Sequence, residues 1–207
     1  MRKEFINGGL VVLIVFIGAA VTFLFTPRLG PEGGSTEPRI IFLPPEKVLV
    51  VEAKGDPALV SPKAIGLLYK GLRSVKGAPW MVAPRARWAF PSPHAPKSEW
   101  TAKFALPVPQ ATTSVPEKAS DGLKTSLETW SYGDVVEVLH VGPYADEKAS
   151  EEIAKAYAKK AGYEVLPDPG NFEEVYLKGP GMFWAGNPLR YRTLLRFKVK
   201  KANPARL

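Results

Sequence analysis

One uninterrupted apolar segment near the start of the chain most constrains how it can fold. Residues 5–25 read FINGGLVVLIVFIGAAVTFLF and carry no charged side chain. At about 1.5 Å of rise per residue, a helix of this length crosses a hydrocarbon core about 30 Å thick. A core helix of a soluble domain would present one polar face, whereas this segment is apolar all round. We therefore expect an N-terminal transmembrane anchor over residues 1–26.

A cleavable signal peptide is the alternative to an anchor. Its apolar region is usually about 7–15 residues long and is followed by small residues at the cleavage site. A small Gly-Ala-Ala stretch occurs at residues 18–20, but the apolar run continues to residue 25, which favours an uncleaved anchor. Because Arg2 and Lys3 precede the segment, the positive-inside rule favours a cytoplasmic N-terminus and a domain on the outer side.

The rest of the chain has the length of one linker and one domain. Pro27 and a Gly-Pro-Ser-rich stretch at residues 30–35 predict the end of the anchor and a flexible linker over 27–43. Residues 44–203 are numerous enough to bury a core without disulfides or metals. We expect them to form a single domain.

Composition excludes several kinds of site. The absence of cysteine excludes disulfides, thiol nucleophiles and Cys-ligated zinc, and two histidines, His94 and His140, exclude a multi-histidine metal centre. We expect no cofactor and no bound metal. We expect His140, late in a strand, to be a packing residue and His94, in a proline-rich loop, to be exposed.

The net charge of +8 is partly concentrated at the C-terminal end of the chain. Near a membrane, anionic lipid is a more economical partner than nucleic acid, which we do not expect. A solvated strand face is the simpler explanation. The basic residues concerned are Arg190, Arg192, Arg196, Lys198, Lys200, Lys201 and Arg206.

The domain sequence shows the same order of elements twice. In repeat one, about 44–110, a β-branched strand at 47–53 precedes a helix that we expect to begin at Ser61-Pro62, and strand-like runs follow around 81–90 and 100–108. In repeat two, about 127–203, a strand at 134–141 precedes a helix over about 146–161 with Gly162 as its stop. Strand-like runs then cover 163–166, 173–177 and 193–200.

Spacings and faces support the duplication. Ile65 and Tyr69 are spaced like Ile153 and Tyr157, which we expect on one face of the second helix with Ala149 and Ala156. Residues 103–106 resemble residues 196–199. The last strand alternates, with Thr193, Leu195, Phe197 and Val199 on one face. The pattern predicts an α+β fold in which β-α-β-β units are duplicated about a pseudo-two-fold axis. We expect two antiparallel sheets, each backed by one helix, with a central cleft.

Two motifs resemble those of a known family. The segment HVGPY at residues 140–144 precedes a helix, and Glu174-Val175-Tyr176 follows at the appropriate distance. Together they resemble the GyrI-like small-molecule-binding domain, the effector-binding domain of AraC-type and MerR-type multidrug-responsive regulators. The resemblance covers about residues 44–201, without a DNA-binding module. The loop over 179–188 departs from the family pattern, because it is richer in glycine and aromatic residues, so the identity of a ligand is open.

The resemblance implies a ligand site in a cleft between the two units. The glutamate of the E-x-Y motif, here Glu174, would face a hydrophobic or cationic aromatic ligand, with Tyr176 on the same strand face. Some relatives hydrolyse reactive small molecules with such a glutamate and tyrosines.

The residues themselves allow two interpretations of Glu174. An unpaired carboxylate facing a cleft favours a cationic guest, and each aromatic wall adds about 0.5–2 kcal/mol through cation–π contact. The candidate walls are Tyr144, Tyr176, Trp88, Phe183 and Trp184. Alternatively, Glu174 pairs with Lys178 or Arg196 on an exposed face, and Tyr144 only caps the core.

We therefore expect a membrane-anchored small-molecule-binding domain. The alternatives are a tethered adaptor that binds anionic lipid or a protein, and a hydrolase that uses Glu174. No catalytic residue is assigned, because nucleophile-elbow, phosphate-loop, dinucleotide and zinc-protease motifs are all absent from the sequence. Haem binding is a remote option, since the two histidines offer no obvious axial pair.

Overall fold

The computed structural model describes residues 36–89, 95–167, 170–180 and 186–203. One compact unit begins at Ser35 and contains all of them. The expected anchor over 1–26 lies outside the described residues and stays a prediction. Within the described ranges, no helix is both long and apolar enough to cross a membrane.

The elements follow the expected order, with additional strands. The first half comprises β1 (Arg39–Leu43), β2 (Glu46–Lys54), α2 (Pro57–Leu72), β3 (Arg85–Ala89), η1 (Lys97–Glu99), β4 (Thr101–Pro107), β5 (Ala119–Ser120) and β6 (Leu123–Trp130). The second half comprises β7 (Gly133–Val141), η2 (Tyr144–Asp146), α3 (Glu147–Lys160), β8 (Tyr163–Val165), β9 (Phe172–Lys178), η3 (Pro188–Arg190) and β10 (Arg192–Lys201).

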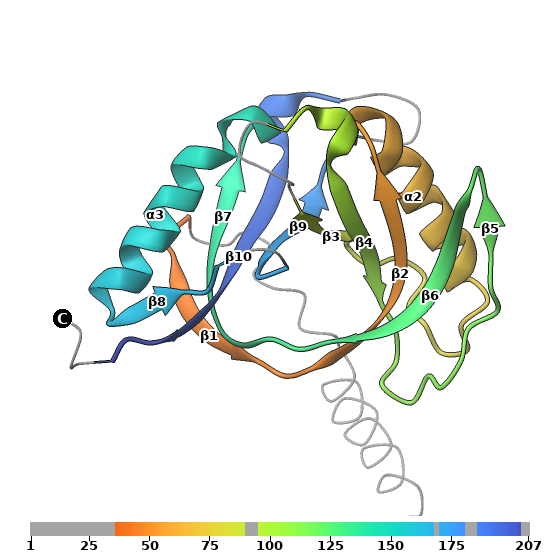
Figure 1. Cartoon of the computed structure of the whole chain (residues 1–207), viewed down its shortest axis with the longest axis horizontal. Helices are drawn as coiled ribbons and strands as arrows, with labels where there is room; N and C mark the ends of the chain where they lie inside the picture. The colour runs from red at the N-terminus through yellow and green to blue at the C-terminus, as the bar shows by residue number, and fades with distance from the viewer. Residues whose placement is uncertain (1–35, 90–94, 168–169, 181–185, 204–207) are drawn as a thin grey trace, which may run out of the picture. The chain divides into compact units, whose positions relative to one another are not determined.

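One continuous sheet replaces the two expected sheets. Its strands run in the order β1-β7-β10-β9-β3-β4-β2-β6-β5, with β8 paired to β10, and all the pairs are antiparallel. The two halves join where β3 pairs with β9 (Figure 1). The expectation of separate sheets was wrong because this pairing leaves neither half with a free inner edge.

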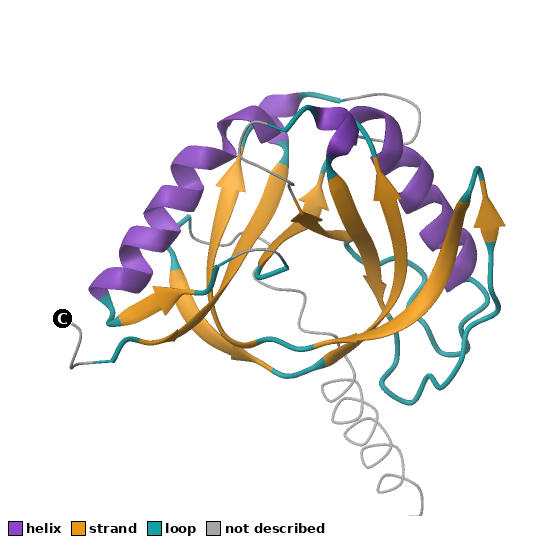
Figure 2. Cartoon of the chain, in the orientation of Figure 1, coloured by secondary structure: helices purple, strands orange, loops and turns teal. Residues whose placement is uncertain are grey.

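Strand β1 corrects the expected domain boundary. Residues 39–43 were assigned to the flexible linker, but they form a strand that pairs with β7. The chain crosses between the halves twice, from β1 to β2 and from β6 to β7 (Figures 1 and 2). Strand β1, which precedes β2, therefore forms an outer strand beside β7, and β6, which precedes β7, pairs with β2.

The ladder registers confirm the duplication residue by residue. Val51 and Glu52 of β2 lie opposite Phe104 and Lys103 of β4. The same pattern recurs in β7 and β10, where Val136 and Glu137 lie opposite Phe197 and Arg196, with arginine in place of lysine. By the same repeat relationship, Trp88 of β3 and Glu174 of β9 occupy equivalent positions in the two repeats.

Helix α2 begins earlier than expected. Asp56 is its N-cap, with a side-chain oxygen that accepts from the Ala58 N–H at 2.9 Å, and Pro57 occupies the first turn. The expected start at Ser61-Pro62 was therefore wrong, and Pro62 lies inside the helix.

Helix α3 packs on a different face from the one expected. Ala154 and Ala158 are fully buried, whereas Ile153 and Tyr157 are 54% and 39% exposed. Small side chains let the helix approach the sheet closely, over a cluster that includes Leu195 and Phe197. The helix ends as expected at Gly162, which has a positive φ of 80°.

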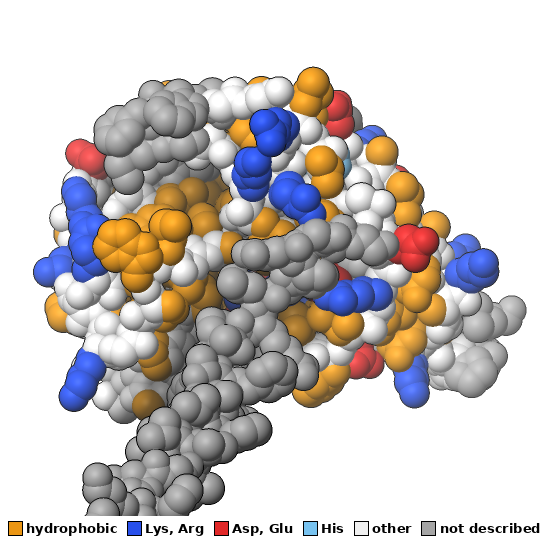
Figure 3. Space-filling view, turned by 180° about the vertical axis from the view of Figure 1, so that it is seen from behind, with side chains coloured by type: hydrophobic (Ala, Val, Ile, Leu, Met, Phe, Trp, Pro, Cys, Tyr) orange, Lys and Arg blue, Asp and Glu red, His pale blue; other side chains and the backbone are white. Residues whose placement is uncertain are grey.

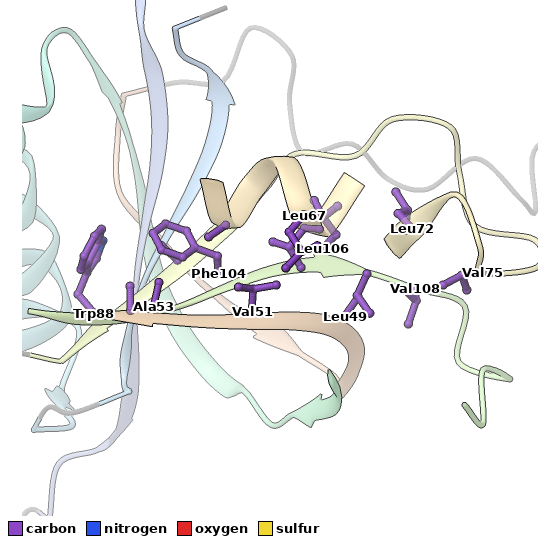
Figure 4. Close-up of a cluster of buried hydrophobic side chains, with 14 residues drawn as sticks. Leu49, Val51, Ala53, Leu67, Leu72, Val75, Trp88, Phe104, Leu106 and Val108 are labelled. Atoms are coloured by element: carbon purple, nitrogen blue, oxygen red, sulfur yellow. The ribbon is translucent and has the colours of Figure 1, made fainter. Parts of the chain in front are cut away.

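The largest core lies between α2 and its half of the sheet. Leu49 and Val51 of β2, Phe104 of β4 and Leu68 of α2 are fully buried in it. Trp88 and Phe104 stand at one end of this cluster and Val75 and Val108 at the other (Figure 4). The side chain of Trp88 therefore rests on packed apolar groups and has little freedom to move.

The face of the sheet opposite the helices, which we call the helix-free face, carries buried ion pairs. Glu137, 1% exposed, accepts from Arg39 and Arg196, and Arg196 also reaches Glu173. Lys200 pairs with Glu164. The basic C-terminal strand is therefore partly neutralised within the domain, which weakens the case for a lipid-binding strand.

Glycine packing in α2 gives a direct test of the core. A Cβ on Gly71 would lie 2.8 Å from a methyl group of Leu49 and 3.2 Å from one of Thr125, whereas nothing lies within 4 Å of a Cβ on Gly66. We expect Gly71→Ala to lower the free energy of unfolding by about 1–3 kcal/mol through overpacking. Gly66→Ala, in the same helix, should raise it by about 0.5–1 kcal/mol. Urea unfolding measures both, and equal effects would contradict this packing.

Candidate functional site

The β3–β9 junction brings Trp88 and Glu174 together. Ala86 lies opposite Glu174 in the ladder, so Trp88, two residues further along β3, is a diagonal neighbour on the same face. Alternation along β9 directs Glu174 and Tyr176 towards the helices and Glu173 towards the helix-free face. Two adjacent glutamates thus enter two different environments.

Neutral donors hold the Glu174 carboxylate. The Trp88 Nε1–H donates to its Oε2 at 3.1 Å, and the Tyr176 hydroxyl donates to the same oxygen. Among the described residues, no lysine or arginine forms an ion pair with Glu174. The alternative pairing with Lys178 or Arg196 is therefore not found.

Glu173 shows the opposite arrangement. Extending the β3–β9 register by one residue places Arg87 opposite Glu173, and the two form an ion pair at 3.2 Å. The Tyr132 hydroxyl donates to Glu173 at 2.8 Å, and Arg196 lies 3.3 Å away. The guanidinium of Arg87 also stacks over Trp130 at 3.9 Å. Arg87 and Arg196 therefore lie on the helix-free face, where they form ion pairs with Glu173.

Burial raises the pKa of Glu174 above its ordinary value. The hydrogen bonds from Tyr176 and Trp88 act in the other direction, because they favour the charged form, but burial is the larger effect. A carboxylate in this position gains more from a cation than an exposed one does, since less solvent screens the attraction.

Tyrosines line the same region. The Tyr144 ring lies 5.8 Å from Tyr176 in an edge-to-face arrangement and 5.2 Å from Tyr191. A Cβ on Gly179 would come within 2.7 Å of the Tyr144 hydroxyl, so a side chain at that position would displace the ring. Tyr191 was not identified from the sequence, because it precedes a strand outside both motifs.

A second carboxyl group in the site was also missed. Glu147, the first residue of α3, is 6% exposed, and its buried Oε1 has no hydrogen-bond partner. Burial, followed by the nearby charge of Glu174, raises the pKa of Glu147 to about 8. Acidic residues in the first turn of a helix are usually solvated, so no sequence pattern indicated this burial.

The other sequence-predicted residues divide into two groups. The structure brings Glu174, Tyr176, Trp88 and Tyr144 together, as described above. Phe183 and Trp184 lie outside the described residues, and their roles stay predictions. His140 is satisfied internally, with ring nitrogens 3.0 Å from the Ser150 hydroxyl and from the Pro143 carbonyl oxygen.

The arrangement combines negative charge with aromatic faces. Two carboxyl groups and three tyrosine rings lie on one side of the sheet junction, and Trp88 supplies both a ring and a donor. Figure 3 shows the domain hollowed beside hydrophobic side chains when it is seen from behind. Such a combination suits a cation that also carries apolar or aromatic surface.

Solved structures with the same fold are known. An uncharacterised conserved protein from Listeria innocua aligns with a TM-score of 0.68 at 21% identity, over 81% of this chain and 94% of that one. A Listeria innocua protein described as a hydrolase aligns at 0.66 and 19%, over 89% and 98%. The EcmrR C-terminal domain aligns at 0.57 and 12%, over 80% and 98%. No family model and no curated protein matches the sequence.

These alignments establish the fold. They extend over most of the chain and nearly all of each neighbour. At identities of 12–21%, the likeness shows the fold alone.

The buried pair of carboxyl groups predicts a pH-dependent stability. In the folded state burial raises the pKa of Glu147 to about 8, whereas the ordinary pKa of a glutamate is about 4.5. Folding therefore takes up a proton between these values, and stability falls as pH rises through that window. We expect the fall from pH 5 to 8.5 to be roughly 2–3 kcal/mol smaller in Glu147→Gln than in the unmodified protein.

Chemical denaturation at a series of pH values measures this difference. Glu152→Gln, on the exposed side of the same helix, is the matched control and should follow the unmodified protein. Parallel curves for Glu147→Gln and the unmodified protein would show that Glu147 is already ionised at neutral pH.

Proposed function

We propose that the domain binds a bulky aromatic cation, with Glu174 as its anionic contact. The observation that carries this proposal is that a partly buried carboxylate is held by neutral donors and by no lysine or arginine among the described residues. A structural glutamate would instead resemble Glu173, which is surrounded by cations and a tyrosine hydroxyl. The two neighbours thus provide an internal comparison.

Energetics support a cation over a neutral ligand. Removing a carboxylate from water costs several kcal/mol, and a partner of opposite charge recovers most of that cost only at close range. Tyr144, Tyr176 and Trp88 then contribute quadrupole attraction to the same guest. A neutral aromatic ligand would bury the ring faces but leave the charge of Glu174 uncompensated.

Tetraphenylphosphonium, a bulky aromatic monocation, is a suitable probe. We expect Glu174→Gln to weaken its binding by about ten- to a hundredfold, since one charge contact of this kind contributes about 1.5–3 kcal/mol. Isothermal titration calorimetry measures the affinities. Glu152→Gln removes the same charge from an exposed position and should bind like the unmodified protein.

Equal affinities of Glu174→Gln and the unmodified protein for tetraphenylphosphonium would show that Glu174 is not the anionic contact of the ligand. Near-ultraviolet circular dichroism of each variant establishes that a lost affinity does not reflect lost folding.

A further inference from the structure

Glu147 stands out among the buried polar groups of the described residues. Its side chain is more than nine-tenths buried, yet Oε1 has no hydrogen-bond partner. The hydroxyl of Thr193, a fully buried residue, also lacks a partner within strict bonding geometry, but it lies beside this carboxyl and lowers the pKa of Glu147 as a hydrogen-bonding neighbour. A buried polar atom without a partner costs about 1–3 kcal/mol, so the incompletely satisfied carboxyl of Glu147 can gain from a ligand or solvent group.

Ladder positions place these atoms beside the tyrosines of the site. Thr193 lies opposite Tyr176 on one side and opposite His140 on the other, so all three side chains share the helix-side face. His140 contacts Ser150, one turn further along α3 than Glu147. Glu147 therefore faces the sheet close to the E-x-Y motif rather than the outer surface of α3.

Glu147 and Glu174 are two carboxyl groups in one poorly solvated region. Glu174 is the charged group that most strongly influences Glu147, and Glu151 adds a weaker negative influence. The other groups that face Glu147 are the hydroxyls of Tyr144, Tyr176 and Thr193, because burial keeps both tyrosines protonated. Without a cation among the described groups, ionising both carboxyls is unfavourable.

We propose that Glu147 is a second acidic contact of the site and that the site prefers ligands with two cationic centres, whose binding releases the proton that Glu147 holds. This rests on the proposed function. One cationic centre meets the carboxylate of Glu174, and the second meets Glu147 as its carboxyl proton leaves for solvent. A monocation meets Glu174 alone and leaves that proton in place.

Calorimetry with two probes tests the proposal. Methyl viologen, an aromatic dication, and tetraphenylphosphonium are titrated into the full chain at pH 7 in buffers of different ionisation enthalpy, which reports protons released. We expect about one proton per methyl viologen bound and much less for tetraphenylphosphonium, since a carboxyl with a pKa of about 8 is mostly protonated at pH 7. Affinity for methyl viologen should rise about tenfold from pH 6 to 7 and level off above pH 8.

Variants separate the two carboxyl groups. Glu147→Gln should abolish the proton release and reduce the preference for methyl viologen over tetraphenylphosphonium by at least about tenfold. Glu152→Gln, exposed on the same helix, should retain both. Retention of the proton release in Glu147→Gln would overturn the assignment.

Outcomes with the unmodified protein distinguish this inference from the proposed function. If tetraphenylphosphonium binds but methyl viologen releases no proton, the role of Glu147 is wrong and the role of Glu174 stands. If neither ion binds, the proposed function itself is wrong.

Discussion

The antiparallel pairing of β3 with β9 is the interaction on which the rest of this domain depends. It converts two duplicated units into one sheet and sets Arg87 against Glu173 at the centre of the pseudo-symmetry. Because the inner strands are related by the same symmetry, it also places Trp88 beside Glu174. A shift of β9 by one residue in this register would send Glu174 and Tyr176 to the other face of the sheet. The position of the Glu174 carboxylate is thus determined by strand pairing rather than by the conformation of a loop.

Charge is divided between the two faces of the sheet. The helix-free face gathers the arginines and pairs them with Glu137 and Glu173, both buried. The helix side receives Glu147 and Glu174. Among the described residues, Trp88 and Tyr176 donate to Glu174, and no lysine or arginine forms an ion pair with either carboxyl. The paired charges interact within the domain. An unpaired carboxylate can still gain a favourable interaction with a cationic ligand.

Local sequence patterns predicted many of the strands and helices. They did not predict which distant strands pair with one another. The strands around Val51, Val136 and Phe197 and the stop at Gly162 followed from apolar alternation and turn chemistry. Strand β6, LKTSLETW, has few apolar residues and pairs at the outer part of the sheet, so it left little pattern to detect. The burial of Glu147 depends on the packing of small alanines, which let α3 approach the sheet through a face that hydrophobicity alone would not select.

The most direct test of the central claim compares two ions of nearly the same shape and opposite charge. Tetraphenylphosphonium and tetraphenylborate present equivalent apolar surface, so their difference in affinity isolates the electrostatic contribution of the site. If an unpaired carboxylate governs recognition, the cation should bind at least about a hundredfold more tightly, equivalent to about 2.7 kcal/mol. Equal binding of the two ions, or tighter binding of the borate, would contradict the account.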